Sequence, residues 1–317
     1  MTSMVARGSS AAVLAITALA PLVWGSTYAV TSEFLPPDRP MFTALMRALP
    51  AGLVLLAMTR TLPHGRWIGR VALLGVLNIG AFFPLLFLAA YRLPGGVAAV
   101  LGSAAPVFAL GFAGLLLRTR PSARKVLAGI IGIAGVALVV LRANAALDPI
   151  GVLAGVAGAA AMAGGTVLTG HWGRPAGVGP LAFTSWQLTA GGLVLLPLAL
   201  ITEGAPPALD GAAVGGYLYL GVLGTAVAYA VWFRGLARVP ATSVAFLGLL
   251  SPLSAAVIGW AALGQSLNAL QLFGMVIALG GTLLGQTGVR ATEPKPFDQV
   301  LPPADRSETT NSGIRTA

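Results

Sequence analysis

The sequence predicts an all-α membrane protein with ten transmembrane helices, arranged as two inverted five-helix repeats around a central cavity. Three observations lead to this fold class. The 317 residues are 56% hydrophobic and only 9% charged, with a mean hydropathy of +0.87. Soluble domains carry about 25% charged residues, so this chain cannot cover a surface that faces water. The chain also contains ten long apolar stretches, and the second five resemble the first five.

Each predicted helix is an apolar stretch of sufficient length. A helix that spans a bilayer needs about 20 predominantly apolar residues. The stretches that meet this requirement are roughly 12–32, 40–59, 68–90, 95–117, 124–141, 150–171, 180–201, 212–234, 240–262 and 267–287. The first stretch resembles the core of a signal peptide, but further spans follow it, so we expect it to be a membrane helix.

An internal repeat relates the two halves of the chain. Gly52–Leu56 recurs letter for letter as Gly192–Leu196, 140 residues later, and each copy is preceded by a small-residue break, at 24–27 and 164–166. The rarer matching letters lie 146 residues apart for Arg92 with Arg238, Pro94 with Pro240 and Pro106 with Pro252, and 145 apart for Gly129 with Gly274 and Gly135 with Gly280. Such self-similarity indicates one duplicated module.

The repeat divides the chain into five parts. Residues 1–11 are a short cytoplasmic N-terminus, 12–142 the first repeat, 143–149 a linker, 150–287 the second repeat and 288–317 a tail. The tail is rich in proline, threonine and charge and has few large apolar residues, so we expect it to be disordered in the cytoplasm.

The odd number of spans in each copy predicts that the copies are inverted, because the second copy then enters the membrane from the opposite side. Fifteen Lys and Arg residues lie on the side of the N-terminus, whereas only Arg39, Arg92 and Arg142 lie on the other side. By the positive-inside rule, both termini are expected in the cytoplasm. The loop before the last helix is strongly basic in the first copy (118–125) and uncharged in the second (264–268), as inverted copies require.

The composition excludes several classes of function. The net charge of +10 would favour a nucleic-acid partner in a soluble protein, but here the basic residues lie between apolar spans and anchor them, so we expect no nucleic acid. Cysteine is absent and the two histidines, His64 and His171, lie in a loop and near a span end, so we expect no metal and no cofactor. No cluster of aspartates could hold magnesium, and no serine and deep histidine form a protease site. We therefore expect no enzyme, with an intramembrane enzyme, a channel or a scaffold as the alternatives.

Several motifs resemble the EamA family of the drug/metabolite transporter superfamily. They are Trp24-Gly25-Ser26-Thr27, Arg47, Leu93-Pro94, Ala105-Pro106, Val239-Pro240, Ser251-Pro252 and Trp186-Gln187 before a run rich in Gly and Leu. The resemblance covers about residues 12 to 287. It implies a ten-helix carrier of the inner membrane, often an exporter of amino acids or other small metabolites, with a central cavity between the two modules.

Arg47 is a candidate for substrate binding because of its depth. It lies about seven residues inside its span, or ~10 Å below the boundary at the helical rise of 1.5 Å per residue. An arginine there costs a few kcal/mol unless it faces protein or water. The alternatives are that Arg47 extends outward or pairs structurally with Glu33 or Asp38. Its repeat counterpart, Gln187, is polar without charge.

Asn78 is the strongest further candidate, because an unsatisfied amide is costly in the middle of a span. The other candidates for substrate binding are polar or aromatic residues near mid-depth: Trp24, Thr27, Phe82, Ser103, Thr166, Thr225, Tyr229 and Ser251. For the polar side chains the alternative role is a hydrogen bond between helices, and for the rings it is packing. Tyr28 and Trp232 lie near span ends and fit an interfacial aromatic belt.

Glycines and prolines inside the spans have structural interpretations. Two series with spacings of three and four residues predict close helix packing rather than a phosphate loop: Gly129, Gly132 and Gly135, and Gly151, Gly155 and Gly158. Pro84, Pro106 and Pro252 interrupt helical hydrogen bonds and mark bend points.

All nine carboxylates fall in loops, at span ends or in the tail. A proton-coupled carrier usually needs a buried titratable group, so the sequence favours facilitated movement or exchange. We expect a secondary transporter that exports an amino acid or a similar neutral or zwitterionic solute by alternating access. A carrier of anionic metabolites or drugs is the alternative that Arg47 supports. The expected partners are the solute and the lipid bilayer, with the protein a monomer or a homodimer.

Overall fold

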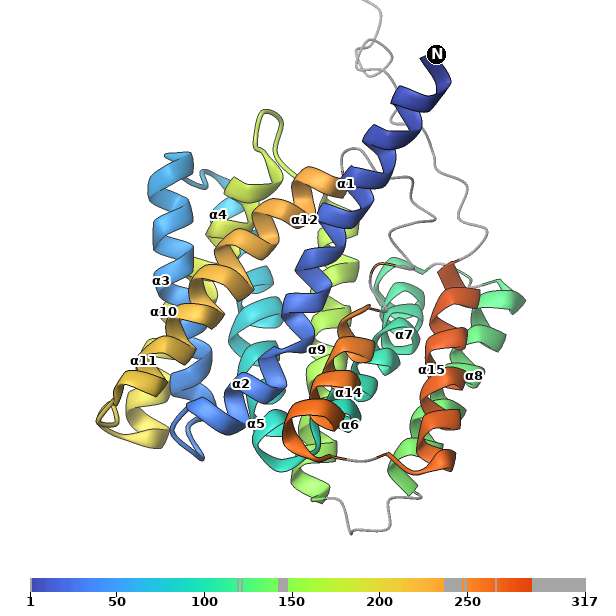
Figure 1. The fold of residues 1–317 in the computed structure, drawn as a ribbon. Helices are drawn as coiled ribbons and strands as arrows, with labels where there is room; N and C mark the ends of the chain where they lie inside the picture. Colours follow the sequence, from blue (N-terminus) through green and yellow to red (C-terminus); the bar gives the residue numbers. More distant parts are fainter. Residues whose placement is uncertain are drawn as a thin grey trace, which may run out of the picture. The chain divides into compact units, whose positions relative to one another are not determined.

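The computed structural model describes residues 2–118, 120, 122–141, 148–236, 247, 250–265 and 267–286, and these residues contain helices and no strand (Figure 1). The predicted tail, most of the linker and most of the first ten residues of the ninth predicted span lie outside the described residues.

The helices of the first half follow the predicted spans within a few residues, except that α1 begins well before its span. They are α1 (Thr2–Gly25) and α2 (Thr27–Phe34); α3 (Pro40–Thr59); α4 (Arg66–Gly75), η1 (Val76–Ala81) and α5 (Phe82–Arg92); α6 (Gly95–Leu101), η2 (Gly102–Ala104) and α7 (Ala105–Leu117); and α8 (Ala123–Leu141).

The helices of the second half follow the same order. They are α9 (Pro149–Trp172); α10 (Pro180–Glu203); α11 (Gly211–Leu218), η3 (Tyr219–Val227) and α12 (Ala228–Leu236); α14 (Leu250–Leu263); and α15 (Ala269–Gln286). In the described part, seven helical stretches are long and apolar enough to cross a membrane, and two further apolar helices are shorter. The prediction of an all-helical membrane protein is confirmed, while the total of ten spans stays a prediction.

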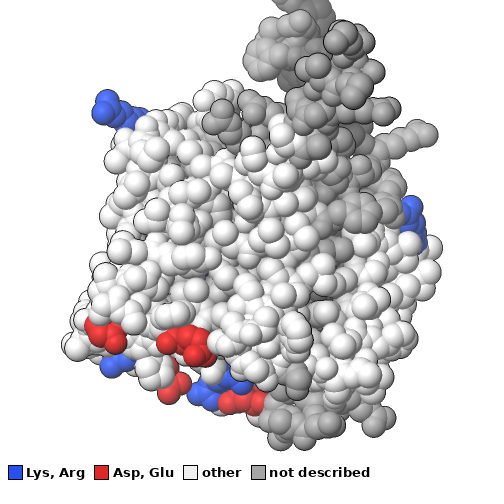
Figure 2. Space-filling view, viewed as in Figure 1, with Lys and Arg blue, Asp and Glu red and all other residues white. Residues whose placement is uncertain are grey.

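The outer surface has the character of a lipid-facing surface. Large apolar side chains stand exposed along the helices, among them Ile201 (79%), Leu115 (77%) and Met58 (69%). The face in Figure 2 carries its charged side chains near its edges, and its middle is formed by uncharged residues. Such a surface is stable in a hydrocarbon environment and not in water.

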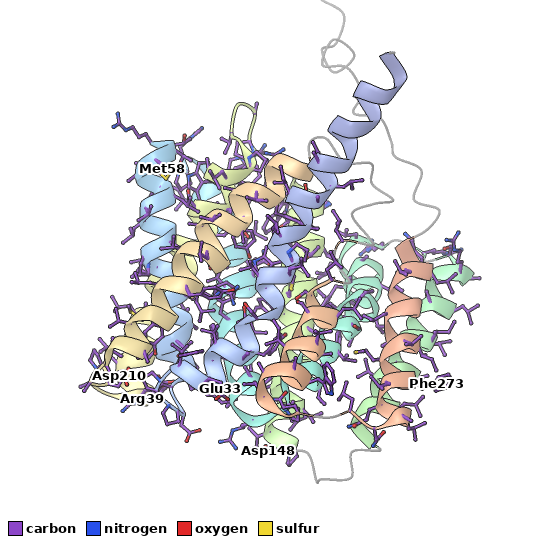
Figure 3. All side chains as sticks on the ribbon, viewed as in Figure 1. Glu33, Arg39, Met58, Asp148, Asp210 and Phe273 are labelled. Carbon is purple, nitrogen blue, oxygen red and sulfur yellow. The ribbon has the colours of Figure 1, made fainter. Side chains whose placement is uncertain are left out.

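The carboxylates of the described part all lie at one end of the bundle, where α3 begins. They are Glu33, Asp38, Asp148, Glu203 and Asp210, of which Glu33, Asp148 and Asp210 are labelled in Figure 3 together with Arg39. Met58, near the other end of α3, lies at the opposite end of the bundle in the same view. The expectation that no acid lies at mid-depth is therefore confirmed for the described residues.

The third helical stretch of each half departs from α-helical geometry at mid-length. In the first half the π-helix η1 ends at Ala81, three residues before Pro84, which lacks the N–H that would bond to the Gly80 carbonyl. In the second half the π-helix η3 contains Thr225, whose hydroxyl donates to the carbonyl of Leu220, 2.9 Å away and five residues earlier. A π-segment leaves backbone carbonyls without their usual partners, and such segments are frequent at functional sites.

The predicted breaks have different outcomes. The helix is interrupted at Ser26, whose hydroxyl donates to the Val23 carbonyl (2.7 Å) and shares a hydrogen bond with the Tyr219 hydroxyl (2.6 Å). The 3-10 turn η2 ends at Ala104, two residues before Pro106, as a proline bend predicts. By contrast, α9 continues without interruption through 164–166.

The crossing of α3 and α10 is reciprocal between the halves. A Cβ atom added at Gly52 would lie 2.7 Å from the Thr189 nitrogen, and one at Gly192 would lie 2.8 Å from the Leu49 Cβ. Residues 49 and 189, like residues 52 and 192, are 140 apart. Each helix therefore presents the same two positions to the other, as in a contact across a two-fold axis.

The crossing of α8 and α15 has the same property. A Cβ atom at Gly135 would lie 2.3 Å from the Ala278 nitrogen, and one at Gly281 would lie 2.6 Å from the Gly132 nitrogen. In this crossing Gly135 corresponds to Gly281 and Gly132 to Ala278, each pair 146 residues apart. The sequence comparison had paired Gly135 with Gly280, but a Cβ atom at Gly280 would meet nothing within 4 Å. Both backbones approach closely at these glycines, as the first glycine series predicts.

The second glycine series packs α9 against the first half. A Cβ at Gly151, Gly155 or Gly158 would lie 2.8 Å from Leu93, 2.5 Å from Leu101 or 3.3 Å from Leu85, respectively. α9 contacts α5 and α7, and α1 contacts α12 and α14. The first helix of each half thus packs on the third and fourth helical stretches of the other half, so the halves interlock.

Candidate functional site

Arg47 lies inside the bundle with its side chain only 4% exposed. Its Nε donates to the Thr225 hydroxyl (3.2 Å) and its Nη2 donates to the Gly224 carbonyl (3.4 Å). Its guanidinium carbon lies 4.7 Å from the centroid of the Phe83 ring, within the range of a cation–π contact. Both acceptors belong to η3, so the π-helix supplies the carbonyl and the hydroxyl that hold the arginine.

The structural pairing considered for Arg47 is wrong. No carboxylate of the described residues contacts its guanidinium, and Glu33 instead accepts a hydrogen bond from Ser32 at the exposed end. The Nη1 atom is buried and has no hydrogen-bond partner. The guanidinium thus lies beside two neutral acceptors and an aromatic ring.

Trp24 joins the same group from α1. Its Nε1 donates to the Gly224 carbonyl (3.0 Å), which therefore accepts from both Trp24 and Arg47. The Trp24 ring lies 5.4 Å from the Tyr229 ring and 5.4 Å from the Trp232 ring. The structure thus gathers four of the predicted candidates, Trp24, Arg47, Thr225 and Tyr229, around one backbone carbonyl. We call these four residues the Arg47 cluster.

Asn78 forms a second polar contact, in η1. Its Nδ2 donates to the Oε1 of Gln187 on α10 (2.7 Å), and Gln187 donates in turn to the Phe183 carbonyl (3.5 Å). A Cβ at Gly165 would lie 1.9 Å from the Asn78 Oδ1, so this glycine makes room for the amide. The observed contact of Asn78 is the hydrogen bond between helices that was its alternative role.

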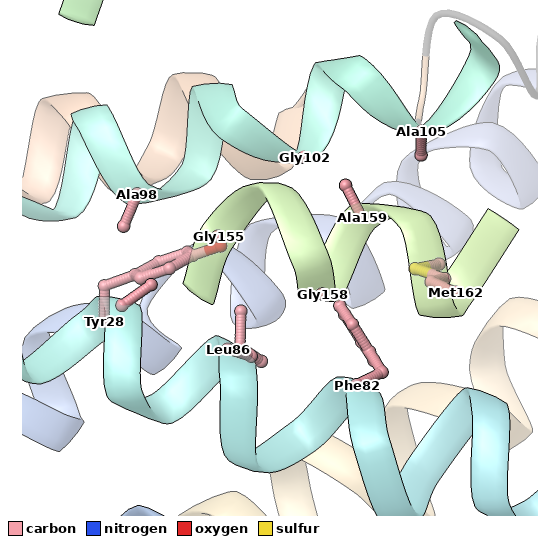
Figure 4. A pocket seen from close by; sticks show the side chains of 11 residues that line it. Tyr28, Phe82, Leu86, Ala98, Gly102, Ala105, Gly155, Gly158, Ala159 and Met162 are labelled. Carbon is pink, nitrogen blue, oxygen red and sulfur yellow. The ribbon is translucent and has the colours of Figure 1, made fainter. Parts of the chain in front are cut away.

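A small, partly open cavity of about 80 Å³ lies between α2, α5, α6, η2, α7 and α9 (Figure 4). Its lining is mostly small and apolar: Tyr28, Phe82, Leu86, Ala89, Ala98, Gly102, Ala105, Gly155, Gly158, Ala159 and Met162. Phe82 was among the predicted candidates. Tyr28 was expected in an interfacial belt, and this expectation is wrong because its ring lines the cavity.

The remaining candidates lie apart from the Arg47 cluster. Thr27 is 1% exposed and its hydroxyl has no hydrogen-bond partner, whereas Thr166 is exposed on α9. Ser103 is half-buried in η2, next to the cavity residue Gly102, and the Ser251 carbonyl accepts from the Ser254 hydroxyl (3.0 Å). Their part in substrate binding stays a prediction.

The polar links that join the two halves at the acidic end include the following three. Arg92 donates to Asp148 (2.8 Å), and this hydrogen bond, aided by those from the Gly151 and Ile150 backbone, holds the pKa of Asp148 below its ordinary value. The Glu203 carboxylate accepts from the backbone N–H groups of Met41 (2.7 Å) and Phe42 (2.9 Å), and so caps α3. The third link runs from the Gly95 N–H to Gln265, 3.0 Å away.

The fold and this site define a multi-pass helical membrane protein in which polar side chains converge at mid-depth beside a cavity. This is the arrangement of a membrane transporter. The chain belongs to the EamA-like transporter family of the drug/metabolite transporter superfamily, because the family model matches it twice, over residues 10–141 and 149–285.

Known proteins of this kind are similar over most of the chain. Protein PecM of Dickeya dadantii is 44% identical over 267 residues, which cover 84% of this chain and 90% of PecM. The uncharacterized inner membrane transporter YedA of Escherichia coli is 28% identical over 285 residues, covering 87% and 90% of the two chains. One crystal structure has a TM-score of 0.59 over 86% of this chain and 96% of that chain, with 18% identity, and this likeness concerns the fold alone.

Proposed function

We propose that the protein is a secondary transporter of the inner membrane that exports a small neutral or zwitterionic metabolite, such as an amino acid. The observation that carries this proposal is the gathering of the Arg47 cluster at a π-helix, close to a small cavity of about 80 Å³ lined by Phe82 and Tyr28. Family membership and the likeness to an inner membrane transporter support both the activity and the membrane.

The transport mechanism we propose is alternating access between two inverted five-helix repeats. The reciprocal crossings of α3 with α10 and of α8 with α15 support a two-fold relation between the halves. In Figure 1, α1 begins at the upper end, where N is marked, while α9 begins at the lower end, next to Asp148 in Figure 3. An inverted pair can exchange the conformations of its halves, and this exchange turns the cavity to the other side.

The orientation we propose places both termini in the cytoplasm. Basic residues lie at helix ends opposite to the acidic end: Arg60, Arg118, Arg120 and Arg174 follow α3, α7 and α9, and Arg66, Arg124 and Lys125 lie in the first turns of α4 and α8. The positive-inside rule assigns such an end to the cytoplasm. Tagging each terminus with a reporter that is active only in the cytoplasm tests this: activity from one terminus alone would overturn the orientation.

The energy coupling we propose is facilitated movement or exchange. No carboxylate of the described residues lies at mid-depth, where a coupling proton would be bound and released. In proteoliposomes, a pH gradient imposed without a solute gradient is expected to drive no flux. Flux under that condition would contradict the proposal.

Saturable counterflow in proteoliposomes tests the transport function itself. The full-length protein and Asn78→Ala are screened for thermal stabilisation and efflux with amino acids and small metabolites. A carrier accelerates uptake of labelled solute when unlabelled solute is inside, whereas a channel, scaffold or enzyme does not. Absence of counterflow with every solute would overturn the proposal. Efflux restricted to anionic metabolites would favour the second candidate, an anion carrier, which the unneutralised Arg47 supports.

A further inference from the structure

The contact between α3 and η3 does not require the positive charge of Arg47, because a neutral side chain makes the equivalent contact in the other half. Residues 47 and 187 are 140 apart and residues 78 and 224 are 146 apart, so Gln187 with Asn78 corresponds to Arg47 with Gly224. In one half the neutral amide of Gln187 makes the link to the π-helix of the other half. The same link at Arg47 is made by a cation. A glutamine would therefore suffice for packing, and the charge needs another explanation.

The surroundings of Arg47 leave that charge without a counterion. Its two acceptors, the Thr225 hydroxyl and the Gly224 carbonyl, are neutral, and its Nη1 donor is buried without a partner. A guanidinium binds a carboxylate through charge-assisted hydrogen bonds, which are stronger than those to neutral acceptors.

Arg47 is connected to the cavity through aromatic side chains. Phe82 lines the cavity, and its ring lies 5.8 Å from the ring of Phe83, on which the guanidinium of Arg47 rests. Tyr28 lines the same cavity (Figure 4) and follows Trp24, a member of the Arg47 cluster, by four residues. In this conformation the Phe82 and Phe83 rings separate the cavity from the guanidinium, so a carboxylate in the cavity reaches Arg47 only when this layer of rings moves aside.

We infer that the transported solute carries a carboxylate that binds Arg47 and an apolar part that occupies the cavity beside Phe82, Leu86 and Met162. Tyr28, which lines the cavity close in sequence to Trp24 of the Arg47 cluster, determines specificity for the acidic end. The lining of the cavity contains no carboxylate that could bind an ammonium group. The carboxylate of the solute is therefore required and its amine is dispensable. This inference rests on the proposed transport function and narrows its substrate class to apolar amino acids and apolar monocarboxylates.

Matched triplets of solutes test the inference with the full-length protein. Phenylalanine, phenylalaninamide and 3-phenylpropionate share one apolar part, and leucine, leucinamide and 4-methylpentanoate share another. Thermal stabilisation in detergent measures binding, and counterflow in proteoliposomes measures transport. We expect the wild type to bind the acids more tightly than the amides by roughly 10- to 100-fold, the range for a hydrogen bond to a charged group.

The variants separate charge from packing. Arg47→Gln introduces the residue that the other half already uses at this position, and we expect it to fold and to lose the preference for acids. Arg47→Lys keeps the charge and is expected to retain part of the preference, and it replaces Arg47→Gln as the test if that variant does not fold. Tyr28→Phe is expected to weaken binding of the acids more than binding of the amides. Gln187→Ala is the matched control and should leave the preference unchanged.

The outcomes distinguish this inference from the proposed function. Equal binding of acids and amides by the wild type overturns the inference. An Arg47→Gln variant in which binding of the acids and binding of the amides fall by the same factor overturns it as well. If no acid binds but other neutral solutes show saturable counterflow, the inference fails and the transport function stands. If the acids bind through Arg47 and no solute shows counterflow, the binding site stands and the transport function fails.

Discussion

Asn78 and Gln187 are joined by a hydrogen bond of 2.7 Å. In the internal repeat these two residues correspond to Gly224 and Arg47, which are joined by a hydrogen bond as well. In each contact one residue belongs to a π-helix, Asn78 to η1 and Gly224 to η3. Its partner belongs to the second helix of the other repeat, Gln187 to α10 and Arg47 to α3. The two contacts are equivalent in position and differ in charge. The duplication has thus kept the link and changed its chemistry on one side.

The link between Asn78 and Gln187 is expected to stabilise the packing of η1 on α10. Hydrogen bonds between membrane helices contribute about 0.6 kcal/mol on average and up to about 2 kcal/mol. We expect Asn78→Ala and Gln187→Ala each to lower the free energy of unfolding, and the double variant to lose less than the sum. A coupling energy of about 1 kcal/mol from a double-mutant cycle, measured by unfolding in mixed micelles, supports the link. Strict additivity would show that the two side chains do not interact.

The crossing of α8 and α15 makes opposite predictions for two adjacent glycines. A Cβ at Gly281 would lie 2.6 Å from the backbone nitrogen of Gly132, whereas a Cβ at Gly280 would meet nothing. Because backbone cannot move aside cheaply, Gly281→Ala is expected to destabilise the protein by about 1–3 kcal/mol, the usual cost of overpacking. Gly280→Ala is expected to be neutral or slightly stabilising, since alanine favours a helix. Melting temperatures in one detergent measure both, and equal effects would contradict the close crossing.

Much of this fold could be predicted because membrane helices are long and their composition is extreme. Composition located the described helices within a few residues, apart from the early start of α1. The π-segments could be predicted only in part, since Pro84 marks η1 but η3 contains no proline. The break at 24–27 occurred and the one at 164–166 did not. Gly165 allows close contact with Asn78 there. Sequence alone cannot distinguish a glycine that allows close helix contact from one that ends a helix.

The site could be predicted by residue type and less well by contact. Polar and aromatic letters at mid-depth located the Arg47 cluster, but their partners come from helices far apart in sequence. The Gly224 carbonyl was missed because a backbone group is present at every residue and no residue type marks it, although the neighbouring Thr225 was a candidate. Tyr28 was misplaced because distance from a span end does not say which way a ring points. A signal for Gln187 was present in the repeat, which pairs it with Arg47.

The link between Arg92 and Asp148 predicts a dependence of stability on pH. The hydrogen bond from Arg92 lowers the pKa of folded Asp148 below the ordinary value of about 3.9. Its stabilising contribution is therefore complete above that ordinary value and is lost as the pH falls through the lowered folded pKa. We expect the wild type to be more stable than Asp148→Asn at neutral pH, with the difference disappearing in acid.

Melting curves of both proteins across the acid range measure this difference, and taking the difference removes the contribution of the other carboxylates. Because both side chains are about one third exposed, added salt should reduce the difference as well. Curves that remain parallel down to the most acidic pH would show that the ion pair contributes nothing.

Thr225 is expected to position Arg47 through two hydrogen bonds of its hydroxyl. It accepts from the Arg47 Nε and donates to the Leu220 carbonyl, with the side chain fully buried. Thr225→Val keeps the shape but leaves the charged Nε donor of Arg47 without this partner, which costs about 1–3 kcal/mol for a buried group. Thr225→Ser restores the hydroxyl and is expected to recover most of the stability.

Thr202→Val is the matched control, because this threonine also bonds to a helix carbonyl, that of Leu198 (2.7 Å), but is exposed. We expect a small effect there, since water can replace the lost partner. In the Arg47→Gln background, Thr225→Val should cost less than in the wild type, because the charged donor is gone. Thermal unfolding of the four proteins measures this, and an unchanged cost would mean that Thr225 stabilises η3 alone and does not hold the arginine.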